Sequence, residues 1–456
     1  MGFSYDADLV PHFDDSALGY YRVPPERADL TVGFDVFQSK DEAKDNRLDD
    51  LLAALEHGWK KELKRRKSDG GPANDTTTNE RDTKRMRTEA QPNDTPRTRG
   101  QTSRDIQVQS RTNTLDSNIE PPATRTDTHT KPPDRGNNAE QAIPDSGTTR
   151  AQDTADTLQQ QHSALHNNNT HSTVESRAER FNTGVDMVMW RGLMSKLFIT
   201  PYCRNDRFNE PWKFGAMLLD GCIYLCEIKT EQKEMDTRGK MLCYGGFKFE
   251  QYCTVADRAE AQRMAREGTR PEIEHTPVNN SIAYCAIFRS KLGKHRVVMG
   301  AEMDCLKADG RKWDLGSYVE LKTSKVIHSQ RDEENFEKTK LLKSWAQSFL
   351  SGVETIVYGF RDHQSIVRAV QQFKTREMHR NARAKGYWDP QICISFAQGL
   401  LNVVKEVVTE DACDTTYVFE LDNATNSVTA SADSSAGRFQ FFPDGFVERH
   451  STEQHL

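Results

Sequence analysis

Alternation of apolar and polar residues predicts a set of β-strands after residue 210. In these segments the side chains switch between apolar and polar, and turn-forming residues separate one segment from the next. Asp220-Gly221 joins the first two segments, and this dipeptide is typical of a two-residue hairpin turn. The strands are predicted at 213–219, 222–229, 282–289, 297–305, 318–323, 417–421 and 427–431.

Apolar residues recur at helical spacing in four other segments. The last of these begins with Asp389 as N-cap and Pro390 in the first helical position. The helices are predicted at 41–66, 182–198, 334–350 and 389–408. This mixture predicts an α+β fold, a single domain in which helices flank a mixed central β-sheet.

Composition changes abruptly after residue 66. Between Trp59 and Phe181 the chain contains no Phe, Trp or Tyr. Such a segment cannot bury enough apolar surface to offset its conformational entropy, so residues 67–176 are predicted to be a disordered insertion. Because 1–66 is too short to hold a core of its own, we expect it to be the N-terminal part of the domain whose main body is 177–450.

Charge and cysteine content narrow the class of protein. The 456 residues carry a formal net charge of −6, which is no sign of a nucleic-acid binder, although a local basic groove matters more than the total. The nine cysteines show no metal-ligand spacing, and we interpret them as reduced core thiols of an intracellular protein. No segment approaches the ~20 apolar residues that span a bilayer, and the first residues lack a signal-peptide core, so a soluble protein without a membrane is expected.

Two basic clusters, 60–67 and 84–87, resemble a bipartite nuclear localisation signal. They favour a nuclear protein that is also present in the cytoplasm. Alternatively, the first cluster is the solvated end of a helix, where cations meet the negative end of the helix dipole.

Candidate chemistry lies in two of the predicted strands. Glu302 and Asp304 are spaced by two residues in one strand, and Glu320 and Lys322 have the same spacing in another. Residues i and i+2 of a strand share a face, so each pair is expected to project together. If the two strands are neighbours, three carboxylates and one ammonium group converge.

Glu250 adds a further carboxylate, from the aromatic segment 244–252. Clustered carboxylates repel unless a cation neutralises them, and oxygen ligands suit Mg²⁺ or Mn²⁺. An acid followed by Glu-x-Lys resembles the PD-(D/E)xK pattern of metal-dependent nucleases. Alternatively, the segments form an exposed hairpin with charges on its solvent face, but the apolar residues that flank both favour central strands.

Seven strings, in this order and spacing, are similar to the decapping exoribonuclease family, also called the DXO family. They are 189–192, 196–202, 244–252, 300–305, 318–325, 340–349 and 359–361. The resemblance implies a hydrolase of RNA 5′ ends that removes incomplete caps, NAD caps and the pyrophosphate of 5′ triphosphates, with 5′→3′ exoribonuclease activity. It also implies RNA with such ends as the partner and two divalent cations, Mg²⁺ or Mn²⁺, as cofactors.

The same resemblance implies a role for individual residues. The metal ligands would be Glu250, Glu302, Asp304, Glu320 and the carbonyl of Leu321. The catalytic set would be these four acids with Lys322, which is expected beside the nucleophilic water and the scissile phosphate. The substrate-binding set would be Trp190, Arg191, Gly192, Cys285, Glu302, Lys322 and Gln347. Alternatively, Lys322 forms a salt bridge that neutralises part of the carboxylates' charge and takes no part in catalysis.

Two further features concern the RNA. Lys340, Lys343 and Gln347 fall at helical spacings of three and four, so they are expected on one helix face that holds RNA phosphates. Leu9 and Asn46 stand where the family carries an Arg and a Glu, a departure that bears on cap preference and leaves the hydrolytic residues untouched.

Two other hypotheses compete with this prediction. One is a PD-(D/E)xK deoxyribonuclease. The other is a non-catalytic or weakly catalytic partner that stabilises a larger nuclear 5′→3′ exoribonuclease, as one branch of the family does. The presence of all four acids and Lys322 argues against loss of catalysis, although partner binding and catalysis can coexist in one protein.

Overall fold

The computed structural model describes most of the chain outside the predicted insertion. The described residues are 1–37, 39–40, 48–68, 184–203, 211–229, 235–411, 415–422, 425, 427–433, 442–443 and 445–447. The predicted insertion at 67–176 lies outside them from residue 69 onward, as do Asn46 and the basic cluster at 84–87.

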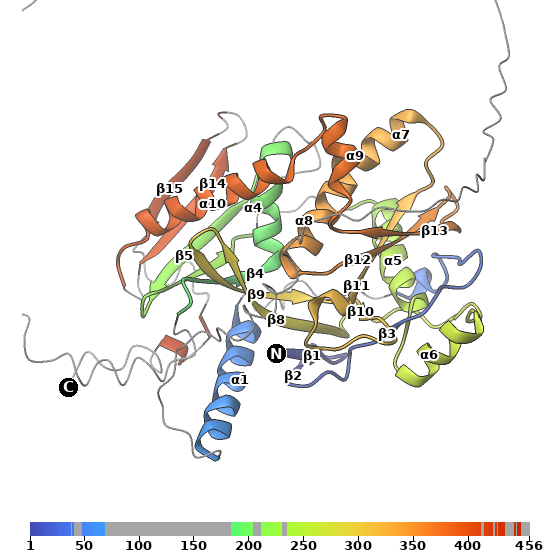
Figure 1. Cartoon of the computed structure of the whole chain (residues 1–456), viewed down its shortest axis with the longest axis horizontal. Helices are drawn as coiled ribbons and strands as arrows, with labels where there is room; N and C mark the ends of the chain where they lie inside the picture. Colours follow the sequence, from blue (N-terminus) through green and yellow to red (C-terminus); the bar gives the residue numbers. More distant parts are fainter. Residues whose placement is uncertain are drawn as a thin grey trace, which may run out of the picture. The chain divides into compact units, whose positions relative to one another are not determined.

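The larger of two sheets has nine strands in the order β15-β14-β5-β6-β4-β9-β8-β1-β2 (Figure 1). Its strands are β1 (Gly2–Tyr5), β2 (Pro11–His12), β4 (Met187–Trp190), β5 (Lys213–Leu219), β6 (Cys222–Glu227), β8 (Ala283–Leu292), β9 (His295–Glu302), β14 (Thr416–Asp422) and β15 (Ser427–Asp433). Neighbours are antiparallel, except that β4 runs parallel to both β6 and β9.

The smaller sheet has six strands in the order β13-β12-β11-β10-β3-β7. Its strands are β3 (Tyr20–Tyr21), β7 (Thr254–Val255), β10 (Cys305–Leu306), β11 (Tyr318–Lys325), β12 (Thr355–Arg361) and β13 (Val367–Lys374). β11 is parallel to β12 and antiparallel to β10. Since β9 ends at Glu302 and β10 begins at Cys305, the chain crosses from one sheet to the other between these residues.

The helices bury apolar faces against both sheets. They are α1 (Asp49–Ser68), α4 (Arg191–Cys203), α5 (Thr237–Tyr252), α6 (Arg258–Glu267), α7 (Gln330–Asn335), α8 (Leu341–Ser351), α9 (His379–Ala384) and α10 (Pro390–Val407), with short 3₁₀ turns at Phe34–Val36 and Leu315–Ser317 and a π-helical turn at Phe336–Lys340 before α8. The main hydrophobic cluster joins α4, α8 and α10 to one face of each sheet. A second joins α1 to the other face of the larger sheet, and a third joins α5 to the other face of the smaller sheet.

The predicted α+β class is confirmed, with two mixed sheets in place of a single central sheet. The hairpin at Asp220-Gly221 is confirmed as the β5–β6 turn, in which both residues have positive φ, 52° and 71°. The helix predicted at 389–408 is α10, and the Asp389 carboxylate caps it by accepting from the Gln391 N–H.

The helix predicted at 182–198 is wrong in its first part. Met187–Trp190 forms strand β4, and the helix begins at Arg191. A short apolar run fits both a buried strand and a buried helix turn, and pairing on both sides with β6 and β9 selects the strand.

Helix α5 follows no strong sequence signal, because three glycines and several aromatic residues lie inside it. Tertiary contacts hold it. The buried Lys248 ammonium donates to Gln251 Oε1 and to the carbonyls of Glu274 and Thr276 at 2.7–2.8 Å. A Cβ at Gly359 of β12 would lie 2.5 Å from the Phe249 ring, so glycine there permits the close approach of α5 to the sheet.

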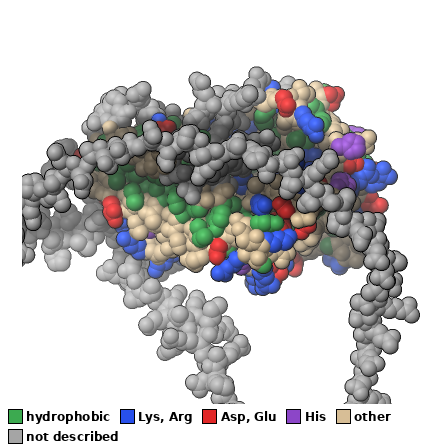
Figure 2. Space-filling view, turned by 90° about the horizontal axis from the view of Figure 1, so that it is seen from above, with side chains coloured by type: hydrophobic (Ala, Val, Ile, Leu, Met, Phe, Trp, Pro, Cys, Tyr) green, Lys and Arg blue, Asp and Glu red, His purple; other side chains and the backbone are tan. Residues whose placement is uncertain are grey.

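The hydropathy of the helices, the surface charges and the burial of the cysteines can be compared with what the sequence predicts. No helix of the described residues is long and apolar enough to cross a membrane. Figure 2 shows basic and acidic side chains interspersed on one face around exposed hydrophobic ones. The described cysteines are free, and all except Cys243 are buried, as expected for core thiols.

Candidate active site

The predicted acidic residues gather where the two sheets meet. Glu302 ends β9 of the larger sheet, and Glu320 and Lys322 lie on β11 of the smaller sheet, so the condition that the two strands are neighbours in one sheet is not met. Asp304 lies in the two-residue crossing that precedes β10, and β10 pairs with β11. The crossing, not a shared sheet, brings the two sequence segments together.

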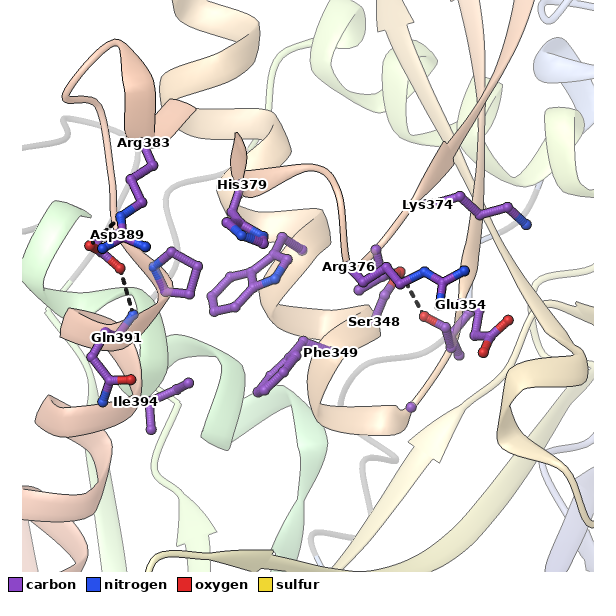
Figure 3. A pocket seen from close by; sticks show the side chains of 15 residues that line it. Ser348, Phe349, Glu354, Lys374, Arg376, His379, Arg383, Asp389, Gln391 and Ile394 are labelled. Carbon is purple, nitrogen blue, oxygen red and sulfur yellow. Dashed lines mark hydrogen bonds and ion pairs between the residues drawn. The ribbon is translucent and has the colours of Figure 1, made fainter. Parts of the chain in front are cut away.

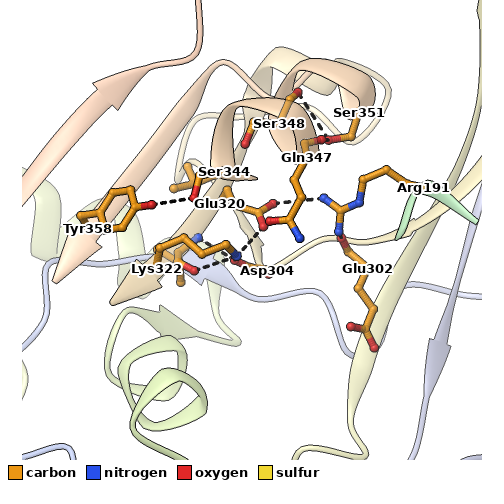
Figure 4. Close-up of polar contacts among 12 residues, drawn as sticks. Arg191, Glu302, Asp304, Glu320, Lys322, Ser344, Gln347, Ser348, Ser351 and Tyr358 are labelled. Atoms are coloured by element: carbon orange, nitrogen blue, oxygen red, sulfur yellow. Dashed lines mark hydrogen bonds and ion pairs between the residues drawn. The ribbon is translucent and has the colours of Figure 1, made fainter. Parts of the chain in front are cut away.

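Asp304, Glu320 and Lys322 form the centre of the site (Figure 4). Lys322 Nζ lies 2.5 Å from Glu320 Oε1 and 3.9 Å from Asp304 Oδ2. It also donates to the Leu321 carbonyl at 3.1 Å, and the Leu321 N–H donates to Asp304 Oδ2 at 2.5 Å. The prediction that Glu320 and Lys322 share a face of their strand is therefore confirmed.

Arg191, the first residue of α4, approaches the same carboxylate from the other side. Its Nη1 lies 3.6 Å from Glu320 Oε2, and its Nη2 donates to the Glu302 carbonyl at 3.5 Å. The side chain is 10% exposed, and its buried Nε and Nη1 groups donate no hydrogen bond to the described residues. A buried guanidinium with spare donors is suited to receive an anionic ligand.

Glu302 does not join this centre. Its carboxylate is 56% exposed and points away from Asp304, toward Lys40 Nζ at 4.0 Å (Figure 4). The expectation that Glu302 and Asp304 project together is wrong, because β9 ends at Glu302 and alternation does not continue through the crossing.

The electrostatics are those of an incompletely neutralised acidic cluster. Burial, and then repulsion by Asp304, raise the pKa of Glu250 well above its usual range. Burial and the charge of Glu320 raise the pKa of Asp304 to about 7. For Glu320, burial alone would raise the pKa, but Lys322 and Arg191 outweigh it and hold the pKa below its usual value.

These residues fit a hard divalent cation. In the arrangement described, no three acidic, His or Cys side chains of the described residues stand close enough to hold a metal. The chemistry of the donors is nonetheless all-oxygen, and the raised pKa values of Glu250 and Asp304 mark carboxylates that lack a neutralising charge.

Gln347 reaches the site from α8 and points toward Glu320 and Arg191 (Figure 4). The two lysines predicted on its face lie nearer the beginning of α8, and Lys340 Nζ donates to the Thr323 carbonyl at 3.4 Å. The three residues thus run from the acidic cluster toward the carboxyl end of β11.

Three predicted substrate-binding residues occupy different settings. Trp190 packs over Gly300, where a Cβ would lie 2.8 Å from its ring, and belongs to the cluster around α1. Gly192 faces open space, since a Cβ there would meet nothing within 4 Å. Cys285 pairs with Glu302 in the β8–β9 ladder and is 1% exposed, so its contact with substrate stays a prediction.

The sequence did not indicate the residues that extend the site beyond Glu302. Lys40 Nζ lies over the Tyr5 ring, 5.6 Å from its centre, and Tyr5 donates a 2.7 Å hydrogen bond to Asp50. These residues come from three segments of the N-terminal part, and no motif links them. Leu9 lies nearby in sequence, in the β1–β2 turn, with a positive φ of 64°.

A separate cavity of about 500 Å³ opens on a different face of α8 (Figure 3). Its lining includes Trp345, Phe349 and Arg383, and Arg383 pairs with Asp389 at 3.0 Å. It contains no carboxylate cluster among the described residues that line it, so the acidic centre remains the candidate active site.

A family model described as "RAI1 like PD-(D/E)XK nuclease" matches residues 1–70 and 128–447. The chain belongs to this family. The match spans both sheets and every residue of the acidic centre. It confirms the resemblance seen in the seven strings.

The relatives bear names that refer to RNA ends. The chain is 35% identical over 268 residues to the "Decapping and exoribonuclease protein" of Mus musculus, covering 57% of this chain and 64% of that protein. It is 36% identical over 234 residues to the "Decapping nuclease RAI1" of Emericella nidulans, covering 49% of this chain and 62% of that protein. The chain thus matches less than two thirds of either relative's length.

Two solved structures share the fold. Scheffersomyces stipitis Rai1 in complex with (3′-NADP)⁺ and calcium ion has a TM-score of 0.59 and 19% identity, covering 98% of this chain and 90% of that one. S. pombe Rai1 in complex with 3′-FADP has a TM-score of 0.52 and 20% identity, covering 95% and 92%. At this identity they show the fold alone.

Proposed function

We propose that this protein is a divalent-metal-dependent hydrolase of RNA 5′ ends. The observation that carries the proposal is the group formed by buried Glu320 and the partly buried Asp304 and Lys322 at the junction of the sheets, with Glu250 within electrostatic range. The substrates we propose are RNAs with an incomplete cap, an NAD cap or a 5′ triphosphate, with 5′→3′ exoribonuclease activity on the exposed end. Decapping names among the relatives and dinucleotides bound to the Rai1 structures support this choice.

The surroundings of each residue in the acidic centre suggest its role in hydrolysis. Glu250, Asp304 and Glu320 would hold the cations together with the Leu321 carbonyl, and Glu302 would complete the oxygen ligands only after its exposed side chain turns toward Asp304. Metal ions in such sites acidify water and neutralise phosphate charge. Lys322 stays protonated, because the three carboxylates raise its pKa against the effect of burial. Its ammonium group can therefore orient the attacking water and stabilise charge on the phosphate oxygens.

Arg191 and Gln347 would position the phosphate. The spare Nε and Nη1 donors of Arg191 belong to the guanidinium that also pairs with Glu320, and the Gln347 amide offers a neutral hydrogen bond on the other side. Lys40, Tyr5 and Trp190 lie on the Glu302 side, where the leaving part of a cap would extend. Water attacks phosphorus, the bond to the leaving oxygen breaks, and the 5′-monophosphate RNA remains.

The experiment is a panel of 3′-labelled RNAs that differ only in the 5′ group: triphosphate, NAD, unmethylated cap and monophosphate, with a matching DNA. Hydrolysis of the RNAs in Mg²⁺ or Mn²⁺, and none in chelator, is expected. Glu337→Gln is the matched control variant, since Glu337 is a buried acid paired with Lys385 away from the site. Cleavage of DNA in preference to every RNA would replace the proposal with a deoxyribonuclease.

The same panel of RNAs also tests the hypothesis that the protein is a non-catalytic partner of an exoribonuclease. A folded protein that hydrolyses none of these RNAs, but raises the activity of a nuclear 5′→3′ exoribonuclease, would be a non-catalytic partner. We propose nuclear localisation with a cytoplasmic fraction, supported by the basic cluster at 60–67 at the end of α1.

A further inference from the structure

The cavity of about 500 Å³ beside α8 is separate from the acidic centre (Figure 3). Its lining comes from α8, the end of β13, α9 and the first turns of α10. Gln347, the residue of α8 that points toward the acidic centre, is not part of this lining. Sites for small molecules in proteins range from about 300 to 1,000 Å³, so the cavity is large enough for a ligand of its own.

One wall of the cavity is apolar and includes an exposed aromatic ring. Trp345 is buried, and its ring stacks on that of Phe349 with the centroids 5.1 Å apart and 24° between the planes. Phe349 is 44% exposed, and Ile394 extends the apolar lining. A planar ligand ring in the cavity would cover the Phe349 ring in the way that aromatic pairs favour.

Arg376, His379 and Arg383 form a basic wall. They are spaced by three and four residues along the helical turn before α9 and α9 itself, so they share one face of that segment. All three line the cavity. Figure 3 shows His379 and Arg383 on the other side of the cavity from Phe349 and Ile394. A ligand between the walls would therefore contact apolar and cationic groups at once.

The acidic groups of the lining leave positive charge in excess. Asp389 pairs with Arg383 at 3.0 Å and also caps α10. Glu354 is the other acid among the described lining residues, against the two cations Lys374 and Arg376. The Arg376 side chain makes no hydrogen bond or ion pair with the described residues. An anion in the cavity would give this guanidinium the partner that it lacks.

A buried hydroxyl group points to a polar ligand in the same cavity. Ser348 lies between the two aromatic residues of α8 in the sequence, lines the cavity and is fully buried. Its Oγ makes no hydrogen bond with the described residues. A buried hydroxyl without a partner costs free energy, and nearly all such groups in proteins are paired. A ligand with oxygen atoms would supply the partner.

We propose that this cavity binds a nucleoside 5′-monophosphate, with the base against Phe349 and the phosphate toward Arg376. A nucleotide combines the two features that the walls recognise, a planar ring and an anion. A ring without an anion would leave Arg376 unpaired, and a free anion would leave the Phe349 ring exposed. Nucleoside 5′-monophosphates are products of 5′→3′ exoribonucleases, so the link to product rests on the proposed function, whereas binding in the cavity does not.

The test measures binding of AMP to the full chain in chelator, which keeps divalent cations out of the acidic centre. Adenosine and inorganic phosphate are the comparison probes, because each lacks one of the two features. The variants are Arg376→Gln, Phe349→Leu and Ser348→Ala. Arg380→Gln is the matched control, since Arg380 is an exposed arginine of α9 outside the lining. Arg191→Gln reports on nucleotide bound at the acidic centre.

Arg376→Gln should weaken AMP binding about tenfold and leave adenosine binding unchanged, because it removes one charge-assisted hydrogen bond. Phe349→Leu should weaken both severalfold, since leucine is apolar but offers no ring face. Ser348→Ala should weaken AMP binding without lowering the melting temperature, because its hydroxyl has no partner among the described residues of the unliganded protein. Arg380→Gln and Arg191→Gln should bind AMP as the wild type does.

Absence of AMP binding by the wild type would overturn the proposal, and so would wild-type affinity in Arg376→Gln. Loss of AMP binding in Arg191→Gln alone would place the nucleotide at the acidic centre instead. Equal affinity for AMP and inorganic phosphate would make the cavity a site for a simple anion. None of these results depends on hydrolysis, whereas failure of the proposed function would appear as absence of cleavage in the RNA panel.

Discussion

The acidic centre and a group of basic residues near the carboxyl ends of β11 and β12, Lys325, Lys340, Lys343 and Arg361, here called the strand-end cluster, differ in how their charges are compensated. In the acidic centre, Glu320 is 3% exposed and is neutralised from within by Lys322 and Arg191. In the strand-end cluster, Lys340 is exposed, and a carbonyl oxygen is its hydrogen-bond partner among the described residues. A buried charge must be compensated by the protein itself, whereas an exposed charge can be compensated by a bound substrate.

This difference predicts separate consequences of mutation. Changes in the acidic centre should alter the chemical step, and changes in the strand-end cluster should alter the affinity for RNA. The following predictions test that separation, beginning with the largest effect.

Asp304→Asn and Glu250→Gln should reduce hydrolysis of every RNA to the uncatalysed background, because each removes a cation ligand. In metal-free buffer at pH 8 these variants should melt at least as high as the wild type, since a repelled carboxylate has been replaced by a neutral amide. Mg²⁺ should raise the melting temperature of the wild type and not that of the variants. Retained Mg²⁺-dependent turnover would remove these residues from the mechanism.

Lys322→Ala should lower kcat by roughly 10²–10³, the size typical of one missing electrostatic stabiliser. Gln347→Ala should cost less, because a neutral amide offers a hydrogen bond without charge. RNA affinity should change little in either variant. Single-turnover rates and RNA titrations, made well below the melting temperature of each variant, provide the comparison. Normal kcat with much weaker RNA binding would make Lys322 a docking residue.

The double variant Lys322→Ala/Arg361→Gln sharpens the separation. Since the two residues lie in groups about 10 Å apart, their free-energy effects should add within about 0.5 kcal/mol. The double variant should show the kcat of Lys322→Ala and the RNA affinity of Arg361→Gln. A kcat far below that of the single variant would mean that the two groups act as one.

Asp186 is a reference outside both groups, because its charge is fully paired. It contacts Arg296 at 3.1 Å and Lys405 at 3.0 Å, and although burial alone would raise its pKa, these partners hold the pKa below the usual value. Asp186→Asn should lower the free energy of unfolding by about 1–2 kcal/mol at pH 7 without changing kcat.

The pH dependence of this reference follows from the direction of the shift. Because the folded-state pKa of Asp186 lies below the unfolded value of about 3.9, its stabilisation is fully present above that pH and declines as the pH falls below it. Denaturant titrations of wild type and variant should therefore converge in acid. A difference of undiminished size at a pH of about 2 would assign the effect to packing.

Sequence patterns predicted what depends on a single strand or helix. The alternation in β11 correctly placed Glu320 and Lys322 on one face, and the cap at Asp389 was confirmed. The same rule failed for Glu302 and Asp304, because the strand ends between them. Alternation describes a strand and does not say where it stops.

Contacts between distant segments could not be predicted in this way. Arg191 meets Glu320, and Lys40 approaches Glu302, only because the two sheets join at residues 303–304. The roles assigned to Arg191, Gln347 and Cys285 came from the family resemblance, and their function stays a prediction. Arg361 carried no sequence signal beyond its place in the string 359–361.

The most direct test of the central claim is hydrolysis in ¹⁸O-labelled water. Purified wild-type protein is incubated with 5′-triphosphate or NAD-capped RNA and Mg²⁺, and the products are analysed by mass spectrometry, with Asp304→Asn alongside. We predict one ¹⁸O atom per cleaved bond, on a product phosphate, only with wild type and only with metal, since water attacks phosphorus. Absence of cleavage, cleavage without label, or equal labelling by Asp304→Asn would contradict this prediction.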